Sequence, residues 1–140
     1  SLRKLKTRQR EIMKQLVFTL LMMLVCEMTA PAQAQIKFEK TVHNFGQFSE
    51  ANAKQSCVFI FTNAGDKPLV INQAVASCGC TAPKYTKTPV LPGEKGELKI
   101  VYNGAGRFPG HFKKTITVRT NGTPEVVRLY IEGDMTETKK

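Results

Sequence analysis

The chain has 140 residues, 41% hydrophobic and 23% charged, a balance typical of one globular domain that excludes a fibrous or intrinsically disordered protein. Its formal net charge is +10, from 21 Lys and Arg against 11 Asp and Glu. Most basic residues after residue 34 stand alone, without interleaved aromatic residues, so we expect no nucleic-acid partner.

The first predicted element is an N-terminal signal peptide helix. An apolar segment covers residues 16–26, broken only by Thr19, and several basic residues precede it. A membrane span needs about 20 apolar residues, so this segment is too short to cross a bilayer. Ala32 and Ala34 then form the small-x-small pattern that signal peptidase requires. We expect residues 1–34 to be an N-terminal extension with a cleavable signal peptide, and residues 35–140 to be the mature domain.

Two other interpretations of this segment are weaker. A buried or membrane-anchoring helix is opposed by Glu27 and Pro31, which end the apolar segment. A lipid anchor on Cys26 is opposed by Val25, which is bulky for the position before a lipidated cysteine. The expected location is therefore outside the cytoplasm, in the periplasm or at the cell surface, with no membrane span in the mature form. Residues 1–12, which precede Met13, are an unexplained extension.

The mature region reads as an all-β domain. Short β-branched and aromatic runs alternate with Gly, Pro, Asn and Asp, and they predict strands at residues 35–38, 41–45, 55–62, 68–75, 96–102, 112–120 and 125–132. About seven strands in about one hundred residues favour an antiparallel, immunoglobulin-like β-sandwich. With fifteen Lys and Arg against nine Asp and Glu, residues 35–140 carry a net charge of +6.

Alternation within these runs predicts which side chains face the core. The inward positions are Cys57, Phe59 and Phe61; Leu98, Ile100 and Tyr102; Phe112, Ile116 and Val118; and Val127, Leu129 and Ile131. One apolar and one polar face per strand is typical of antiparallel sheets that are solvated on one side.

Cys78 and Cys80, separated only by Gly79, form the one Cys-x-Cys motif in the chain. The pair can form a disulfide that staples a bend, exchange thiols with other proteins, or bind a soft metal such as Cu(I) or Zn. Cys57 makes the number of mature cysteines odd and is either a third participant or a small buried apolar residue. A closed zinc site needs four ligands, and the spacing of a zinc ribbon is absent, so we name no metal ligand with assurance and expect no cofactor.

The segment 103–110 is a candidate interaction loop. It is longer than a minimal turn and contains Arg107 beside Phe108, a combination suited to an adaptable contact. A loop insertion that is merely tolerated is the alternative. His43 and His111 lie near predicted strand ends, and no nucleophile motif or phosphate loop accompanies them, so we expect no enzyme.

Six fragments occur in a characteristic order: TVHNFG (41–46), FIFTNAG (59–65), PLVI (68–71), SCGCT (77–81), PGE (92–94) and GHFKK (110–114). This ordered set resembles a bacterial secreted family catalogued as domain of unknown function 1573, which is frequent in Bacteroidetes. The resemblance covers residues 36–134. It implies an immunoglobulin-like sandwich of the kind found in ciliary, centrosomal and periplasmic chaperone proteins, and it implies export. Asn44 stands where the family commonly has aspartate, and residues 50–52 lack its usual glycine.

These observations predict an exported, non-enzymatic interaction module. Its partner would be a protein, bound by strand addition at a sheet edge, or another component of the cell envelope. The alternative functions are soft-metal binding and thiol–disulfide exchange at the Cys-Gly-Cys pair.

Overall fold

The structure, a computed structural model, describes residues 1–24 and 32–139. It divides the chain into two compact units, Ser1–Pro31 and Ala32–Lys140. The end of the predicted apolar segment, with the lipid-anchor alternative at Cys26, lies outside the described residues.

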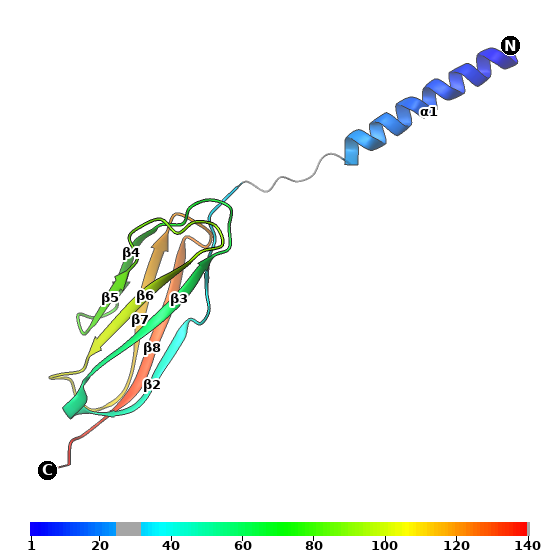
Figure 1. Cartoon of the computed structure of the whole chain (residues 1–140). Coiled ribbons are helices and arrows are strands. Elements are labelled where there is room, and N and C mark those ends of the chain that lie inside the picture. The colour runs from blue at the N-terminus through cyan, green and yellow to red at the C-terminus, as the bar shows by residue number, and fades with distance from the viewer. Residues whose placement is uncertain (25–31, 140) are drawn as a thin grey trace. The chain divides into compact units, whose positions relative to one another are not determined.

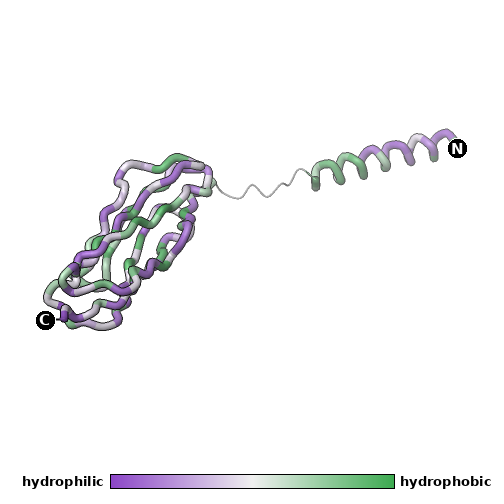
Figure 2. The backbone as a smooth tube through the Cα atoms, turned by 60° about the horizontal axis from the view of Figure 1, so that its bottom comes forward, coloured by the Kyte–Doolittle hydropathy of each residue, from purple (hydrophilic) through white to green (hydrophobic). Residues whose placement is uncertain are grey.

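The N-terminal helix that the sequence predicts is present as α1 (Leu2–Leu24). It begins well before Met13, so the unexplained extension is helical as well. Its residues turn from hydrophilic to hydrophobic along the chain, as the tube in Figure 2 shows. Every residue of α1 is exposed. Within the described ranges, no helix combines the length and the apolar character needed to cross a bilayer.

The second unit consists of eight strands in two four-stranded sheets (Figure 1). In chain order the strands are β1 (Ile36–Phe38), β2 (Val42–Ser49), β3 (Lys54–Asn63), β4 (Ile71–Ala76), β5 (Thr81–Tyr85), β6 (Lys95–Asn103), β7 (Gly110–Thr120) and β8 (Val126–Thr136), with a short 3-10 helix at Glu50–Asn52. One sheet has the order β1-β3-β6-β5 and the other β2-β8-β7-β4. The all-β sandwich is confirmed, but the prediction of seven strands is wrong.

The missed strand is β5, and proline explains the error. Pro83 interrupts its run, and a proline inside a run argues against a central strand. In the structure β5 is an edge strand paired only with β6. The amide of Asn103 bonds to Cys80 and that of Thr86 to Glu97, so alternate residues of β5 face β6 and Pro83 faces away from it. The lack of an N–H at Pro83 therefore leaves the ladder intact.

The core lies between the two sheets and contains the predicted inward faces. The following side chains are each 1% exposed or less: Phe59, Phe61, Leu98, Ile100, Ile116, Val118, Leu129 and Ile131. Burial of one such side chain stabilises a fold by about 1.5–3 kcal/mol. Phe112 and Val127, also expected inside, are only partly buried against this core.

The first two strands belong to different sheets. β1 pairs antiparallel with the end of β3, from Phe38 opposite Phe61 to Ile36 opposite Asn63. The chain then crosses at residues 39–41, and β2 pairs with β8 in parallel, so the sandwich is not purely antiparallel. We call the end of the sandwich at Asn63 the upper end and the end at Lys54 the lower end, as they lie in Figure 1. The crossing leaves β1 beside the upper part of β3 only.

A buried asparagine holds the upper end together. Asn63 is fully buried, and its side-chain nitrogen donates to the carbonyl oxygens of Lys67 (2.7 Å) and Val90 (2.9 Å). Its side-chain oxygen accepts from the amides of Gly65 (3.0 Å) and Gln35 (3.3 Å). Both polar atoms of this amide are therefore satisfied, and the side chain ties the end of β3 to the turn at residues 65–67, to Gln35 and to Val90.

The start of the domain lies earlier than the sequence suggested. Ala34, which we expected as the last residue of the signal peptide, is only 3% exposed and belongs to the core cluster. The compact β unit accordingly includes residues 32–34 as well as the predicted range.

Candidate functional site

The cysteine pair lies at a corner where the chain passes from one sheet to the other. Cys78 and Cys80 are joined by a disulfide with a Cα–Cα distance of 5.3 Å, between β4 in one sheet and β5 in the other. The Ser77 amide donates to the Thr115 carbonyl of β7 (2.9 Å), and the Asn103 amide of β6 donates to the Cys80 carbonyl (2.7 Å). The corner is thus anchored to both sheets. Cys80 is buried and Cys78 is half-buried, so the disulfide is integrated into the fold.

Cys57 does not join this pair. It lies on β3 opposite Ile100 of β6, and Ile100 in turn lies opposite Pro83 of β5. Because neighbouring strands are about 4.8 Å apart, the whole width of β6 separates Cys57 from the strand that follows the disulfide. Burial raises the pKa of Cys57 to about 11, and nearby Lys40 opposes this shift. Cys57 is therefore a protonated, buried thiol packed like a small apolar residue.

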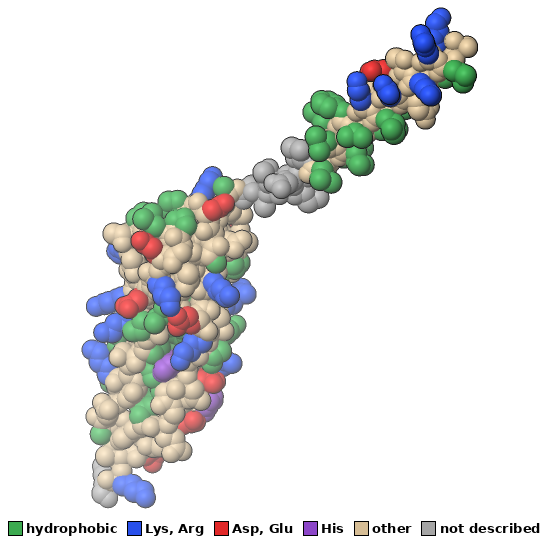
Figure 3. Space-filling view, turned by 45° about the vertical axis from the view of Figure 1, so that its right-hand side comes forward, with side chains coloured by type: hydrophobic (Ala, Val, Ile, Leu, Met, Phe, Trp, Pro, Cys, Tyr) green, Lys and Arg blue, Asp and Glu red, His purple; other side chains and the backbone are tan. Residues whose placement is uncertain are grey.

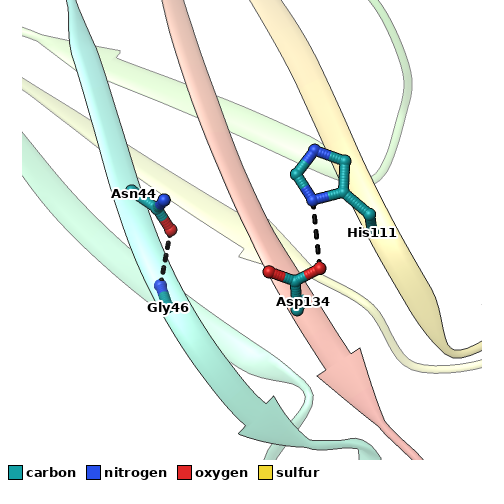
Figure 4. A network of polar contacts seen from close by, with 4 residues as sticks. All are labelled: Asn44, Gly46, His111 and Asp134. Carbon is teal, nitrogen blue, oxygen red and sulfur yellow. Dashed lines mark hydrogen bonds and ion pairs between the residues drawn. The ribbon is translucent and has the colours of Figure 1, made fainter.

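The two histidines lie on separate strands of the β2-β8-β7-β4 sheet. His43 packs edge-on against Phe45 with ring centroids 4.8 Å apart. Its pKa is lowered mainly by burial and, to a smaller extent, by the positive charge of Lys40. His111 Nδ1 lies 3.0 Å from Asp134 Oδ1 in an exposed pair between β7 and β8 (Figure 4). Across the described residues, no three His, Cys, Asp or Glu side chains gather in a metal-binding arrangement.

The loop between β6 and β7 presents the residues that the sequence singled out. The Arg107 amide donates to the Gly104 carbonyl (3.0 Å), and Gly106 and Gly110 adopt positive φ angles of 74° and 135°. Phe108 is 97% exposed, the largest exposure among the exposed large hydrophobic side chains of the described residues. The loop is a defined turn that holds a phenyl ring in solvent at the lower end.

The lower half of β3 is an open sheet edge, which the sequence analysis did not identify. The Glu39 amide bonds to the Ile60 carbonyl and the Ala64 amide to the Gln35 carbonyl, so even-numbered residues of upper β3 face the β1 segment. By the same alternation Lys54, Ser56 and Val58 point their main-chain groups away from β6. In the part of the chain that the structure describes, no strand pairs with these three residues on the side away from β6.

The other edge strands carry features that oppose strand addition, and on β4 this feature is a register irregularity between Ile71 and Gln73. β5 contains Pro83, which has no N–H on its outward side, and β1 has only three residues. β2 is distorted between Asn44 and Gln47, where Gly46 has a φ of 69°. The Asn44 side-chain oxygen accepts the Gly46 amide (2.7 Å) and so holds this bulge (Figure 4). Proline, bulges and a very short strand are usual protections of a sheet edge.

An aromatic cluster lies between the sheets at the lower end. Tyr102, opposite Gln55 of β3, stacks on Phe112 with ring centroids 4.0 Å apart and planes at 7°. Phe45 and Phe48 of β2 pack on the same cluster, with Phe48 5.9 Å from Phe112. The rings of β2 and β7 are partly exposed, so apolar surface accompanies the open edge. The face in Figure 3 shows basic and acidic side chains interspersed.

A family model described as "Protein of unknown function (DUF1573)" matches residues 36–135. A search of curated proteins found no match. Among solved structures, a protein of unknown function from Porphyromonas gingivalis W83 is 15% identical with a TM-score of 0.63. The match covers 77% of this chain and 50% of that one, so the chain spans half the length of that protein.

Two further structures share the fold. The ASH / PapD-like domain 7 of human CEP192 is 10% identical with a TM-score of 0.62, over 81% of this chain and 93% of that domain. The periplasmic chaperone SfaE is 11% identical with a TM-score of 0.51, over 75% and 59%. At these identities the likeness shows the fold alone, which is a PapD-like variant of the immunoglobulin sandwich.

Proposed function

Because this chain belongs to the DUF1573 family, whose function is not established, we propose a function from its geometry: it is an exported, non-enzymatic module that binds an extended segment of a partner protein along the lower edge of β3. The open edge of β3 is the observation that carries this proposal.

Lys54, Ser56 and Val58 each offer one N–H and one C=O to an added strand. Each main-chain hydrogen bond contributes a net of about 1 kcal/mol, so several together give useful affinity. Val58 is 43% exposed, and its side chain provides apolar surface next to the added strand. Main-chain bonds would supply affinity, and the side chains around the edge would supply specificity.

Two features support export. α1 has a basic start and an apolar end, which is the organisation of a signal peptide. The disulfide between Cys78 and Cys80 persists in oxidising compartments and is rare in the cytosol of mesophiles. We therefore assign the mature domain to the periplasm or the cell surface.

The test uses proline to remove one donor from the open edge. Ser56 is exposed and its N–H faces outward, so Ser56→Pro should fold, while Ser56→Thr retains the donor as a matched control. Partners are captured from a cell-envelope extract by cross-linking, and one is purified for affinity measurement. We expect Ser56→Pro to bind at least about tenfold more weakly, a loss of about 1.4 kcal/mol, and Ser56→Thr to bind as wild type. Equal affinities for all three proteins would remove β3 as the contact.

Phe108 is the second candidate contact. Its ring is exposed at the tip of a defined loop, and we expect it to insert into an apolar pocket of the partner. Phe108→Ala should weaken binding of the purified partner, whereas truncating the neighbouring Arg107 to Ala should have a smaller effect. If Phe108→Ala leaves the affinity unchanged, the loop is only a connection between β6 and β7.

Soft-metal binding and thiol–disulfide exchange remain as rivals at the cysteine pair. Reduced protein loaded with copper or zinc is compared with the Cys78→Ser/Cys80→Ser variant by metal analysis. The interaction proposal predicts equal metal content in the two proteins, and no reduction of a disulfide substrate beyond that of a free thiol. Metal bound in proportion to the wild-type cysteines would favour a metal carrier instead.

A further inference from the structure

Gln33 and Ala34 are integral parts of the folded domain. Ala34 is 3% exposed, and its carbonyl oxygen accepts the Thr123 amide (2.9 Å). The Thr123 carbonyl in turn accepts the Ile36 amide (3.1 Å). The Asp66 amide donates to the Gln33 carbonyl (3.1 Å). These residues lie between two loops of the upper end and bond to both.

Two glycines make room for this segment. A Cβ atom on Gly65 would collide with the main chain of residues 33–35, and one on Gly122 would collide with the main chain of Ala34. The loops can pass this close because neither glycine has a side chain. The small size of Ala34 therefore has a packing reason of its own, independent of any protease.

A cut after Ala34 fits this structure badly. It would remove a core side chain and the acceptor of the Thr123 amide. It would also create a charged amine at Gln35, whose nitrogen lies 3.3 Å from Oδ1 of the fully buried Asn63. The partner there is a neutral amide, and a charge near buried groups without an opposite charge is costly.

A cut after Ala32 fits well. The Gln33 nitrogen lies 2.7 Å from Oδ1 of Asp66, an exposed carboxylate. Cleavage at this point converts an amide donor into an ammonium group directly against a negative charge, and all contacts of Ala34 are kept. Ala30 and Ala32 provide the small-x-small pattern for this cut in the sequence.

We propose that the mature protein begins at Gln33 and that its new α-ammonium group binds the Asp66 carboxylate, which fastens the N-terminus to the upper end of the sandwich. The inference rests on the proposed export. Water hydrolyses the peptide bond between Ala32 and Gln33, so that the leader retains the Ala32 carboxylate and the domain retains the amine. The mature chain is then two residues longer than the one the sequence suggested.

The first test is mass spectrometry of the N-terminal peptide of the full chain after expression in an exporting bacterium. We expect the mature chain to start at Gln33 with a free α-amine. A cyclised Gln33 would support the cut after Ala32 but overturn the ion pair with Asp66. A start at Gln35 overturns this inference while export stands. A chain that retains α1 overturns both the inference and the export proposal, so the two failures are distinguishable.

The second test measures the ion pair in the processed protein. Asp66→Asn is compared with Glu125→Gln, which removes an exposed carboxylate beside the neighbouring loop. We expect only Asp66→Asn to lower the urea midpoint near pH 6. The deficit should shrink by about pH 9, because α-amino groups ordinarily titrate near 8 and lysine side chains near 10.4. The adjacent cationic side chain is that of Lys67. The two histidines lie on β2 and β7, outside this segment. A deficit that does not change with pH contradicts an ion pair with the amine.

Discussion

The two halves of β3 have the same outward alternation but different neighbours. The upper half pairs with β1 and ends at Asn63, whose buried side-chain amide bonds to the main chain of Gln35 and Val90. The lower half presents Ser56 and Val58 to solvent, because the chain leaves this sheet at residues 39–41 to form β2 in the other. Because β1 is short and the chain then passes to the other sheet, half of β3 is left as an open edge.

The rest of the molecule shows that the open half is an exception. At the disulfide corner the chain changes sheets again, but Pro83 and the Cys78–Cys80 link protect that side. Unprotected edges promote unwanted pairing, so natural sheets usually block them. The unblocked lower half of β3 is consequently the best site for a partner strand.

The largest expected effect is at the closed end. Asn63→Ala leaves the amides of Gly65 and Gln35 and the carbonyl of Val90 without their partner in a buried site. Each unsatisfied group costs about 1–3 kcal/mol, and partial access of water reduces the sum, so we expect a loss of about 3 kcal/mol in the free energy of unfolding. Urea denaturation measures it. A loss below about 1 kcal/mol would mean that the upper end is not held by this side chain.

Two proline substitutions on the same side of β3 test whether its upper and lower halves differ in their contribution to stability. Thr62 lies opposite Lys37 of β1, whereas Ser56 has no opposite strand on that side in the described chain. Thr62→Pro removes a ladder donor and Ser56→Pro removes a free one. We expect Thr62→Pro to be less stable than Ser56→Pro by about 1–3 kcal/mol in urea denaturation. Equal losses would show that the two halves are energetically alike.

Most of the fold follows from local pattern, and the candidate site does not. Alternation identified the inward residues of β3, β6 and β8, and the Gly-containing loop led to Phe108. β5 was missed because it contains Pro83. A strand accepts a proline only where the nitrogen faces away from its neighbour, and this depends on the strand register. The open edge depends on where β1 stops, and the burial of Asn63 depends on three other segments. These are non-local facts that one sequence does not encode in a recognisable motif.

A smaller effect is expected at the disulfide corner. Cys78→Ser/Cys80→Ser opens a covalent loop of only three residues. The chain-entropy relation for so short a loop gives about 1–2 kcal/mol, so we expect a loss of that size in urea denaturation. Binding of the partner at β3 should be unchanged, because the corner lies on the opposite side of the sheet. Lost binding in a folded variant would place the contact at the corner instead.

The smallest effect is the pH dependence that His43 contributes. Its pKa in the folded state lies below the ordinary value of 6.5, so the unfolded chain binds the proton more readily. Stability due to this group is complete above that value and declines as the pH falls through it towards the folded pKa. His43→Gln should reduce the decline in urea midpoint between about pH 7.5 and 5.5, whereas His111→Gln serves as the exposed control. A decline that persists unchanged in His43→Gln would assign it to the carboxylates.

Hydrogen exchange, followed amide by amide with NMR, tests the open edge most directly. In the free monomer we predict fast exchange at Ser56 and Val58 and slow exchange at Thr62, because only Thr62 lies opposite β1. On addition of the captured partner, Ser56 and Val58 should become protected while Thr62 remains as before. Slow exchange at Ser56 and Val58 in the free monomer, or no added protection in the complex, would contradict strand addition at β3.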